Sequence, residues 1–139
     1  MNEFVTALIA PGGPFEVHEE IIDGIAMKAY ANRFPNLTTV AQFGLAHADK
    51  EFIVYGARRI TYGEFFAEVA RLSGALHAAG IRSGDRVAVL SQNCPEWCAA
   101  FWATVTGGAI LVGLNGWWTT DEILYGLEDS GSSILFIDQ

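Results

Sequence analysis

Residues 86–137 read RVAVLSQNCPEWCAAFWATVTGGAILVGLNGWWTTDEILYGLEDSGSSILFI and carry the clearest pattern of alternating strands and helices. Three short apolar runs in this stretch alternate with two longer segments of helical pattern. The expected strands are 86–90, 109–114 and 133–137, and the expected helices are 95–106 and 120–129. Apolar strands joined by helices are typical of a parallel sheet with right-handed crossovers and with both faces covered. The sequence therefore predicts an α/β fold built on a β-α-β-α-β unit.

Helix starts are marked most clearly by two pairs of capping residues. Thr61 and Glu64 have the spacing in which each side chain satisfies a backbone N–H of the other residue, and Thr119 and Glu122 repeat it. The first pair predicts a helix over 62–79, which precedes the β-α-β-α-β unit. The second pair predicts the start of the helix over 120–129.

The N-terminal third is expected to form small hairpins. Asp23-Gly24 separates two apolar runs, and this dipeptide favours a two-residue hairpin turn. The expected hairpins pair 15–22 with 25–30 and 52–55 with 58–60, and a short helix is expected over 37–46. We divide the chain into an N-terminal hairpin preamble, residues 1–36, and a truncated subdomain, residues 37–139.

Composition excludes several functional classes. The 139 residues are 51% hydrophobic and 17% charged, which predicts a folded chain. The formal net charge of −8 gives no electrostatic basis for nucleic-acid binding. Residues 97–120 carry no charge, but Gly107-Gly108 splits them, so a buried helix followed by a buried strand is favoured over a transmembrane span.

Cysteine usage and the N-terminus suggest a cytoplasmic protein. Cys94 and Cys98 are the only cysteines, and we interpret them as buried thiols that pack as small hydrophobic groups. A zinc site would need two more ligands at metal spacing, and the three histidines are scattered, so no metal site is predicted. Residues 1–14 contain no Lys or Arg, which argues against a signal peptide. Peripheral attachment to a membrane is left open.

Ligands of open parallel sheets collect beyond the carboxyl ends of the strands. That rule places Ser91–Cys94, Asn115–Trp118 and Asp138 at the functional edge. A glycine-rich phosphate loop with lysine is absent from the sequence, and no serine lies in a nucleophile elbow. The residues themselves therefore indicate a folded α/β piece without a catalytic constellation.

Several fragments in order resemble the adenylate-forming acyl-CoA synthetases, the fatty-acid type in particular. The matching fragments are RITYGE (59–64), LSGAL (72–76), GIRSGDRVAVL (80–90), QNCPEW (92–97), GGAI (107–110), LN (114–115), TTDEI (119–123) and DSG (129–131). The resemblance covers 37–139, with a weaker likeness of the leading hairpin. It implies the N-terminal piece of a much longer AMP-forming ligase.

In that family an acid and ATP give an acyl-adenylate, and CoA then displaces AMP, with Mg²⁺ assisting. The phosphate loop, the ribose-binding aspartate and the catalytic lysine of the family have no counterpart in the 139 residues. The resemblance thus implies no catalytic residue here. It also implies a fragment that is inactive by itself and binds none of ATP, CoA or Mg²⁺ alone.

This sequence departs from the family around the second strand. Gly113 stands where many relatives have proline, and Gly116-Trp117 stands where many have Pro-Arg. In some relatives that arginine lies near the CoA passage. The resemblance therefore makes Asn115, Trp117 and Trp118 candidates for proximity to the substrate or CoA, with core or interface packing of the two indoles as the alternative.

Two other functions are compatible with the sequence. One is an adenylation domain that passes its acyl group to a carrier protein, since the front third looks much the same in both. The other is a stand-alone interaction module whose exposed sheet edge pairs with another chain. Beyond the acid, ATP and CoA, the expected partner is the remainder of the enzyme. Surfaces left uncovered by truncation would favour a homo-oligomer.

Overall fold

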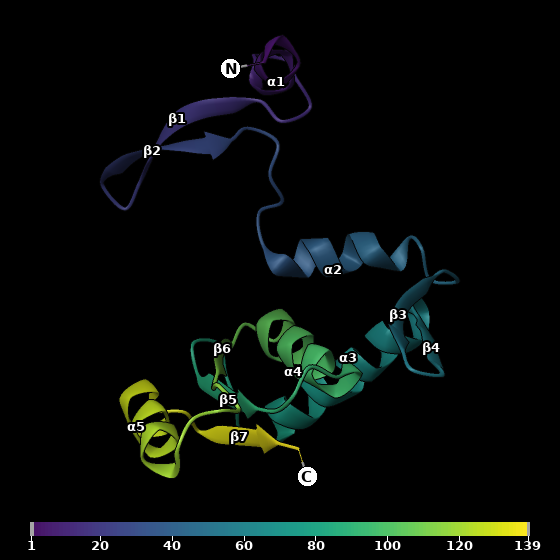
Figure 1. Cartoon of the computed structure of the whole chain (residues 1–139), viewed down its shortest axis with the longest axis vertical. Helices are drawn as coiled ribbons and strands as arrows, with labels where there is room; N and C mark the ends of the chain where they lie inside the picture. The colour runs from purple at the N-terminus through teal and green to yellow at the C-terminus, as the bar shows by residue number, and fades with distance from the viewer. Residues whose placement is uncertain (1, 139) are drawn as a thin grey trace. The chain divides into compact units, whose positions relative to one another are not determined.

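The computed structural model describes residues 2–138, and contacts divide the chain into two units, Met1–Pro35 and Asn36–Gln139. The first unit holds a helix and a hairpin. The second holds every other helix and strand of the described residues (Figure 1).

The first unit contains helix α1 (Glu3–Ile9) and the antiparallel pair β1 (Val17–Ile22) and β2 (Ile25–Tyr30). The hairpin confirms the prediction, because Asp23 and Gly24 both have positive φ, 51° and 81°, as the expected turn requires. Helix α1 was not predicted. The Asn2 side chain caps it by accepting a hydrogen bond from the Phe4 N–H, and none of its residues is buried.

The second unit begins with helix α2 (Leu37–Leu45), the hairpin of β3 (Glu51–Tyr55) and β4 (Arg58–Thr61), and helix α3 (Tyr62–Ala78). All four were predicted. The hairpin turns through Gly56, whose φ of 58° costs glycine little.

The parallel sheet consists of β5 (Arg86–Leu90), β6 (Ile110–Gly113) and β7 (Ile134–Ile137), in the order β6-β5-β7. Helix α4 (Pro95–Thr106) joins β5 to β6, and helix α5 (Thr120–Ser130) joins β6 to β7 (Figure 1). Both pairings are parallel, and Ala88 lies opposite Val112 on one side and Leu135 on the other. The predicted β-α-β-α-β unit is confirmed.

Capping residues fix the starts of these helices. The Thr61–Glu64 and Thr119–Glu122 pairs both form complete capping boxes. Helix α4 is capped differently, since the Trp97 N–H donates to the Cys94 Sγ at 3.4 Å. The interpretation of Cys94 as a buried hydrophobic thiol is therefore wrong: it is half-buried and acts as an N-cap.

The core lies between the sheet and the pair α3 and α4. Its buried side chains include Phe65 and Val69 of α3, Val87 of β5, and Ala99 and Ala103 of α4. The alanines of α4 let the two helices approach each other and the strand.

The opposite face of the sheet is less covered than predicted. Arg86, at the start of β5, is held there by α5, because its Nε donates to the Ser130 carbonyl at 2.9 Å. Leu135 and Ile137 of β7 lie on this face by register, yet they are 36% and 66% exposed. The expectation that helices cover both faces of the sheet is met where α5 contacts Arg86 of β5. It is not met at β7, where Leu135 and Ile137 are exposed.

Candidate functional site

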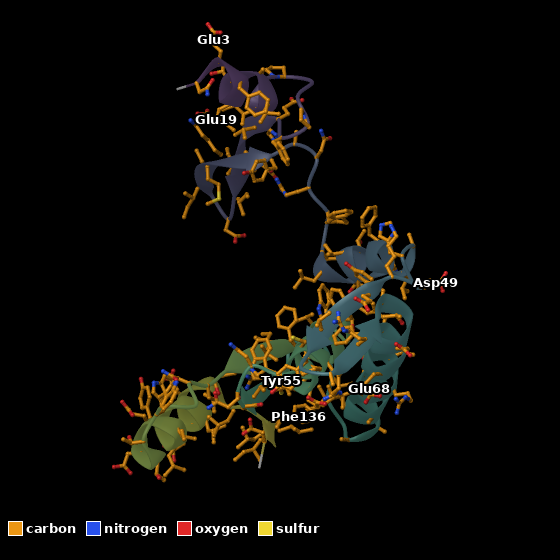
Figure 2. All side chains as sticks on the ribbon, turned by 45° about the vertical axis from the view of Figure 1, so that its right-hand side comes forward. Glu3, Glu19, Asp49, Tyr55, Glu68 and Phe136 are labelled. Atoms are coloured by element: carbon orange, nitrogen blue, oxygen red, sulfur yellow. The ribbon has the colours of Figure 1, made fainter. Side chains whose placement is uncertain are left out.

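A groove of about 780 Å³ opens at the carboxyl ends of β5 and β7, and we name it the sheet-end groove. Its walls come from the β3–β4 hairpin, α3, α4 and the ends of the two strands. Figure 2 shows Tyr55, Glu68 and Phe136, which belong to three of these elements and line the groove together.

The lining of the groove is apolar below and acidic at the rim. Phe65, Val89 and Ala99 line it and are almost fully buried. The charged lining residues are four carboxylates and one guanidinium: Glu64, Glu68, Glu96, Asp138 and Arg58. Such a rim repels phosphates and carboxylates, so the groove suits an apolar or basic group better than an anionic nucleotide.

Asp138 ties the ends of two strands together. Its Oδ2 accepts hydrogen bonds from the Ser91 hydroxyl at 2.8 Å and from the Gln92 N–H at 2.7 Å. The Gln92 N–H, and after it the Ser91 hydroxyl, lower the pKa of Asp138 below its ordinary value. The carboxylate therefore fixes the loop after β5 against the end of β7.

An ion pair joins the hairpin to the start of α4. The Arg58 Nη1 lies 2.7 Å from the Glu96 Oε1, and both side chains are exposed. The hydrogen bond from Arg58 is the main cause that lowers the pKa of Glu96. Arg58 and Glu96 both line the groove, so the ion pair connects the hairpin to α4 at its edge.

Two thiols lie at the start of α4. Besides capping the helix, the Cys94 Sγ lies 3.6 Å from the Ser91 Oγ. Burial, and then the neighbouring Cys94, raise the pKa of the Cys98 thiol. A raised pKa disfavours the reactive thiolate, so Cys98 fits a packing role.

The candidates Asn115, Trp117 and Trp118 lie in the loop after β6, outside the sheet-end groove. The Asn115 Oδ1 accepts a hydrogen bond from the Trp117 N–H at 3.0 Å. Trp117 is 86% exposed. The Trp118 ring packs near Gly126 of α5 and is 37% exposed. Trp117 therefore does not pack into the core.

The predicted functional edge is nevertheless a single region of the structure. Ser91 and Gln92 contact Asp138, and the Gln92 side chain also approaches Gly116, whose added Cβ would lie 3.6 Å from the Gln92 Nε2. The loops after all three strands thus meet there, as the rule for parallel sheets requires.

Sequence reasoning missed the part of the groove that the hairpin supplies. Tyr55 and Arg58 were assigned only to a hairpin, and Glu96 only to a helix start. Arg58 and Glu96 are 38 positions apart. Apolar spacing and capping patterns carry no signal for such a pair.

Within residues 2–138 the side chains form no cluster of three or more His, Cys, Asp or Glu suited to a metal ion. The described part of the chain also has no helix with the length and apolar character needed to cross a membrane.

The chain matches the family described as "AMP-binding enzyme" over residues 40–139. It is 40% identical over 91 residues to a 3-hydroxybenzoate–CoA ligase of Aromatoleum sp. (strain CIB), an alignment that covers 66% of this chain and 17% of the relative. It is 32% identical over 108 residues to a fatty acid–[acyl-carrier-protein] ligase of Streptomyces coeruleorubidus. That alignment covers 75% of this chain and 21% of the relative.

A similar solved structure is the inhibitor-bound N-terminal domain of FACL13 from Mycobacterium tuberculosis. It is 30% identical, has a TM-score of 0.71, and is matched over 75% of this chain and 27% of that one. The chain spans about a fifth of the length of the curated relatives described above. The matched region begins in α2 and includes the entire parallel sheet. This chain belongs to the AMP-binding enzyme family.

Proposed function

We propose that the chain is the N-terminal part of a longer ATP-dependent acid–thiol ligase. That enzyme activates a carboxylic acid with ATP to an acyl-adenylate and passes the acyl group to CoA, with release of AMP. The observation that carries the proposal is the family match over the parallel-sheet unit, joined to 40% identity with a relative named as a 3-hydroxybenzoate–CoA ligase.

In this proposal residues 37–139 are a truncated N-terminal subdomain, residues 1–36 are a preamble, and the catalytic residues lie beyond residue 139. The sheet-end groove supports the proposal that ATP is bound by other parts of the enzyme, because the carboxylates at the rim of the groove give an anionic nucleotide no stabilisation. Mg²⁺ would neutralise phosphoryl oxygens of ATP and would be held by other parts of the enzyme. The isolated chain neither adenylates an acid nor binds ATP, CoA or Mg²⁺.

The substrate is a carboxylic acid with an apolar body, and a fatty acid is our first choice. The relatives are named for both kinds of acid, 3-hydroxybenzoate in one and a fatty acid in the other. The test supplies the longer enzyme with ATP, CoA and a panel of aryl and alkyl acids, and detects thioesters by mass spectrometry. Formation of an acyl-CoA together with AMP supports the proposal, and formation of ADP instead of AMP contradicts it.

The second candidate acceptor is a carrier protein. The relative from Streptomyces coeruleorubidus, named for transfer to an acyl-carrier protein, favours it. Offering CoA and a phosphopantetheinylated carrier protein in the same assay separates the two acceptors. Acylation of the carrier protein without acyl-CoA would assign the enzyme to the second class.

We propose further that Asn115, Trp117 and Trp118 lie near the acceptor in the longer enzyme. The exposed Trp117 ring supports this, since it offers a stacking surface and its loop meets the other strand ends. Trp117→Ala should raise the KM for CoA and leave the KM for ATP unchanged. The matched control is Tyr125→Ala, which removes another exposed aromatic ring, on α5. An unchanged KM for CoA removes the assignment.

The proposed location is the cytoplasm, with peripheral membrane attachment left open. Exposed apolar side chains of the isolated chain, such as Ile137, favour self-association. A stand-alone interaction module remains the alternative from another class. Sedimentation separates the two, because a stable monomer without a ligand counts against the module.

A further inference from the structure

A second pocket, of about 430 Å³, lies at the edge of the sheet opposite the sheet-end groove, and we name it the amino-end pocket. The end of α3, the end of α4 and the residues just before β5 and β6 line it. Because β5 and β6 are parallel, these residues lie at the amino ends of both strands. The amino-end pocket shares no lining residue with the sheet-end groove, and its volume is in the range of small-molecule sites.

The inner wall of the amino-end pocket is apolar. Four of its lining residues belong to the hydrophobic core and are at most 8% exposed: Leu76, Ile81, Ala103 and Ala109. Gly74 of α3 also lines the pocket, and a Cβ added there would meet no atom within 4 Å. A molecule in this pocket therefore contacts mostly carbon on its inner side.

One polar group on this wall has no protein partner. Thr104 lines the pocket and is 0% exposed, and its hydroxyl makes no hydrogen bond within the described residues. A threonine inside a helix can donate to the carbonyl four positions earlier, as Thr106 does to Trp102 at 2.6 Å. Thr104 makes no such bond. Because buried hydroxyls are nearly always hydrogen-bonded, a polar atom of a bound molecule is the partner that this hydroxyl calls for.

The rim of the pocket carries a positive charge with two unused donors. The Arg82 Nη1 donates to the carbonyls of His77 and Ile81 at 2.8 and 2.9 Å, which holds the guanidinium at the end of α3. The Nε and Nη2 of Arg82 form the other edge of the group, and they make no hydrogen bond within residues 2–138. Two such parallel N–H groups match the two oxygens of a carboxylate.

The charges around the two pockets differ in sign. None of the described residues that line the amino-end pocket is acidic, whereas four carboxylates line the sheet-end groove. The Asp85 carboxylate lies outside the lining, where it accepts a hydrogen bond from the Arg82 backbone N–H at 2.7 Å. An anionic group is therefore attracted to the amino-end pocket and repelled by the sheet-end groove.

We propose that the amino-end pocket binds a small hydroxycarboxylic acid. Its carboxylate pairs with the Nε and Nη2 of Arg82, its apolar body lies on the core residues of the wall, and its hydroxyl bonds to the Thr104 hydroxyl. Free phosphate has no apolar body, and an unsubstituted acid has no partner for Thr104. The inference does not rest on the proposed function, since it concerns a pocket at the other edge of the sheet.

Calorimetric titration of the full 139-residue chain tests the proposal, with benzoate, 3-hydroxybenzoate and 4-hydroxybenzoate as probes. At least one hydroxybenzoate should bind about fivefold more tightly than benzoate, because a hydrogen bond to the buried hydroxyl is added. Phenol, which lacks the carboxylate, should bind more weakly than that hydroxybenzoate. Equal affinities for benzoate and both hydroxybenzoates, or no saturable binding of any of the three acids, overturn the proposal.

Thr104→Val removes the hydroxyl and keeps the shape of the side chain. The variant should lose the preference for the hydroxybenzoate and keep the affinity for benzoate. Since the hydroxyl has no protein partner, the variant should be no less stable in urea unfolding than the wild type. Thr106→Val, the same change on the same helix but outside the pocket, should retain the preference. If the Thr104 hydroxyl only holds a water molecule, Thr104→Val leaves the hydroxybenzoate affinity unchanged, and the proposal is overturned.

Arg82→Lys keeps the positive charge and removes the paired donors. The affinity for all three acids should fall about tenfold, because a carboxylate loses a charge-assisted hydrogen bond. Arg71→Lys is the matched control, since Arg71 lies on α3, pairs with Glu68 and does not line the pocket. Wild-type affinities in the Arg82→Lys variant would contradict the pairing of the carboxylate with Arg82.

Nuclear magnetic resonance of the labelled chain locates the bound acid. Addition of the tighter hydroxybenzoate should shift the amide signals of Ser83, Thr104 and Gly107, which line the amino-end pocket. The signals of Ser91 and Gln92, which line the sheet-end groove, should stay in place. Shifts confined to the sheet-end groove would place the acid there and refute the inference.

Discussion

The carboxylate of Asp138, the residue after β7, accepts a 2.8 Å hydrogen bond from the hydroxyl of Ser91, the residue after β5. The same oxygen accepts from the Gln92 N–H. A charged acceptor strengthens both bonds. Two neighbouring strand ends are therefore held together at the edge where ligands of parallel sheets bind.

Asp138→Asn should make the stability of the chain less dependent on pH in the acidic range. The folded pKa of Asp138 is lowered, so its carboxylate stabilises the fold fully above the ordinary aspartate pKa of about 3.9, and this contribution is lost as the pH falls through the lower folded pKa. Urea unfolding at several pH values measures the difference between wild type and variant. The difference in stability between wild type and variant should be largest above about pH 5 and should shrink below about pH 4.

The matched control for this prediction is Asp49→Asn, which makes the same change of charge. The Asp49 side chain points outward (Figure 2) and makes no hydrogen bond within the described residues. If Asp138→Asn and Asp49→Asn changed the pH dependence of stability equally, the hydrogen bonds of Asp138 to Ser91 and Gln92 would not be the cause of the change.

The Arg58–Glu96 ion pair should contribute little to stability. Both side chains are exposed, and pairs of this kind contribute about 0.2–1 kcal/mol. A double-mutant cycle with Arg58→Met and Glu96→Gln measures the coupling, and 1 M salt should reduce it. A coupling well above this range that persists in high salt would show that the pair is shielded from solvent.

The two capping boxes should differ in their effect on the whole fold. Thr61→Ala should cost about 0.5–2 kcal/mol of global stability, because α3 carries the buried residues Phe65, Val69 and Leu76. Helix α5 has no buried residue, so Thr119→Ala should mainly speed amide exchange in α5. Chemical unfolding and hydrogen exchange together distinguish the two effects. Equal losses of global stability would contradict this division.

Two glycine substitutions should change the stability of the fold in opposite directions. Gly108 has a φ of 81°, and an added Cβ would lie 3.1 Å from the Ser83 Oγ, so Gly108→Ala should destabilise the fold by about 1–2 kcal/mol. Gly74 lies in α3 with open space around its Cβ position, so Gly74→Ala should stabilise by about 0.5–1 kcal/mol. Thermal unfolding of both variants measures the two changes in stability. A stabilising effect of Gly108→Ala would contradict the positive φ assigned to Gly108.

Local signals predicted the elements of the second unit. Apolar runs and capping pairs are properties of neighbouring residues, so α3, α5 and the strands of the sheet could be assigned from the sequence. Helix α1 was missed because it is short, and Asn2 with Glu3 is its only start signal. The thiol of Cys94 was not recognised as a cap, since caps are usually hydroxyl, carboxyl or amide groups.

The candidate site was predicted only where the sheet itself defines it. The contact of Ser91 with Asp138 follows from parallel strands whose carboxyl ends share an edge. The ion pair of Arg58 with Glu96 depends on how the hairpin lies against α4, which local patterns do not encode. Likewise, the apolar sequence of β7 predicts burial on both sides, and only the structure shows that Leu135 and Ile137 are exposed.

Pyrophosphate exchange tests most directly whether these residues are part of an AMP-forming ligase. The longer enzyme, given a carboxylic acid, Mg²⁺ and ATP, should exchange labelled pyrophosphate into ATP, and the 139-residue chain should not. Exchange that depends on the acid and is confined to the longer enzyme is the predicted result. Exchange by the isolated chain, or its absence from the longer enzyme with every acid of the panel, would contradict the proposed division between scaffold and reaction centre.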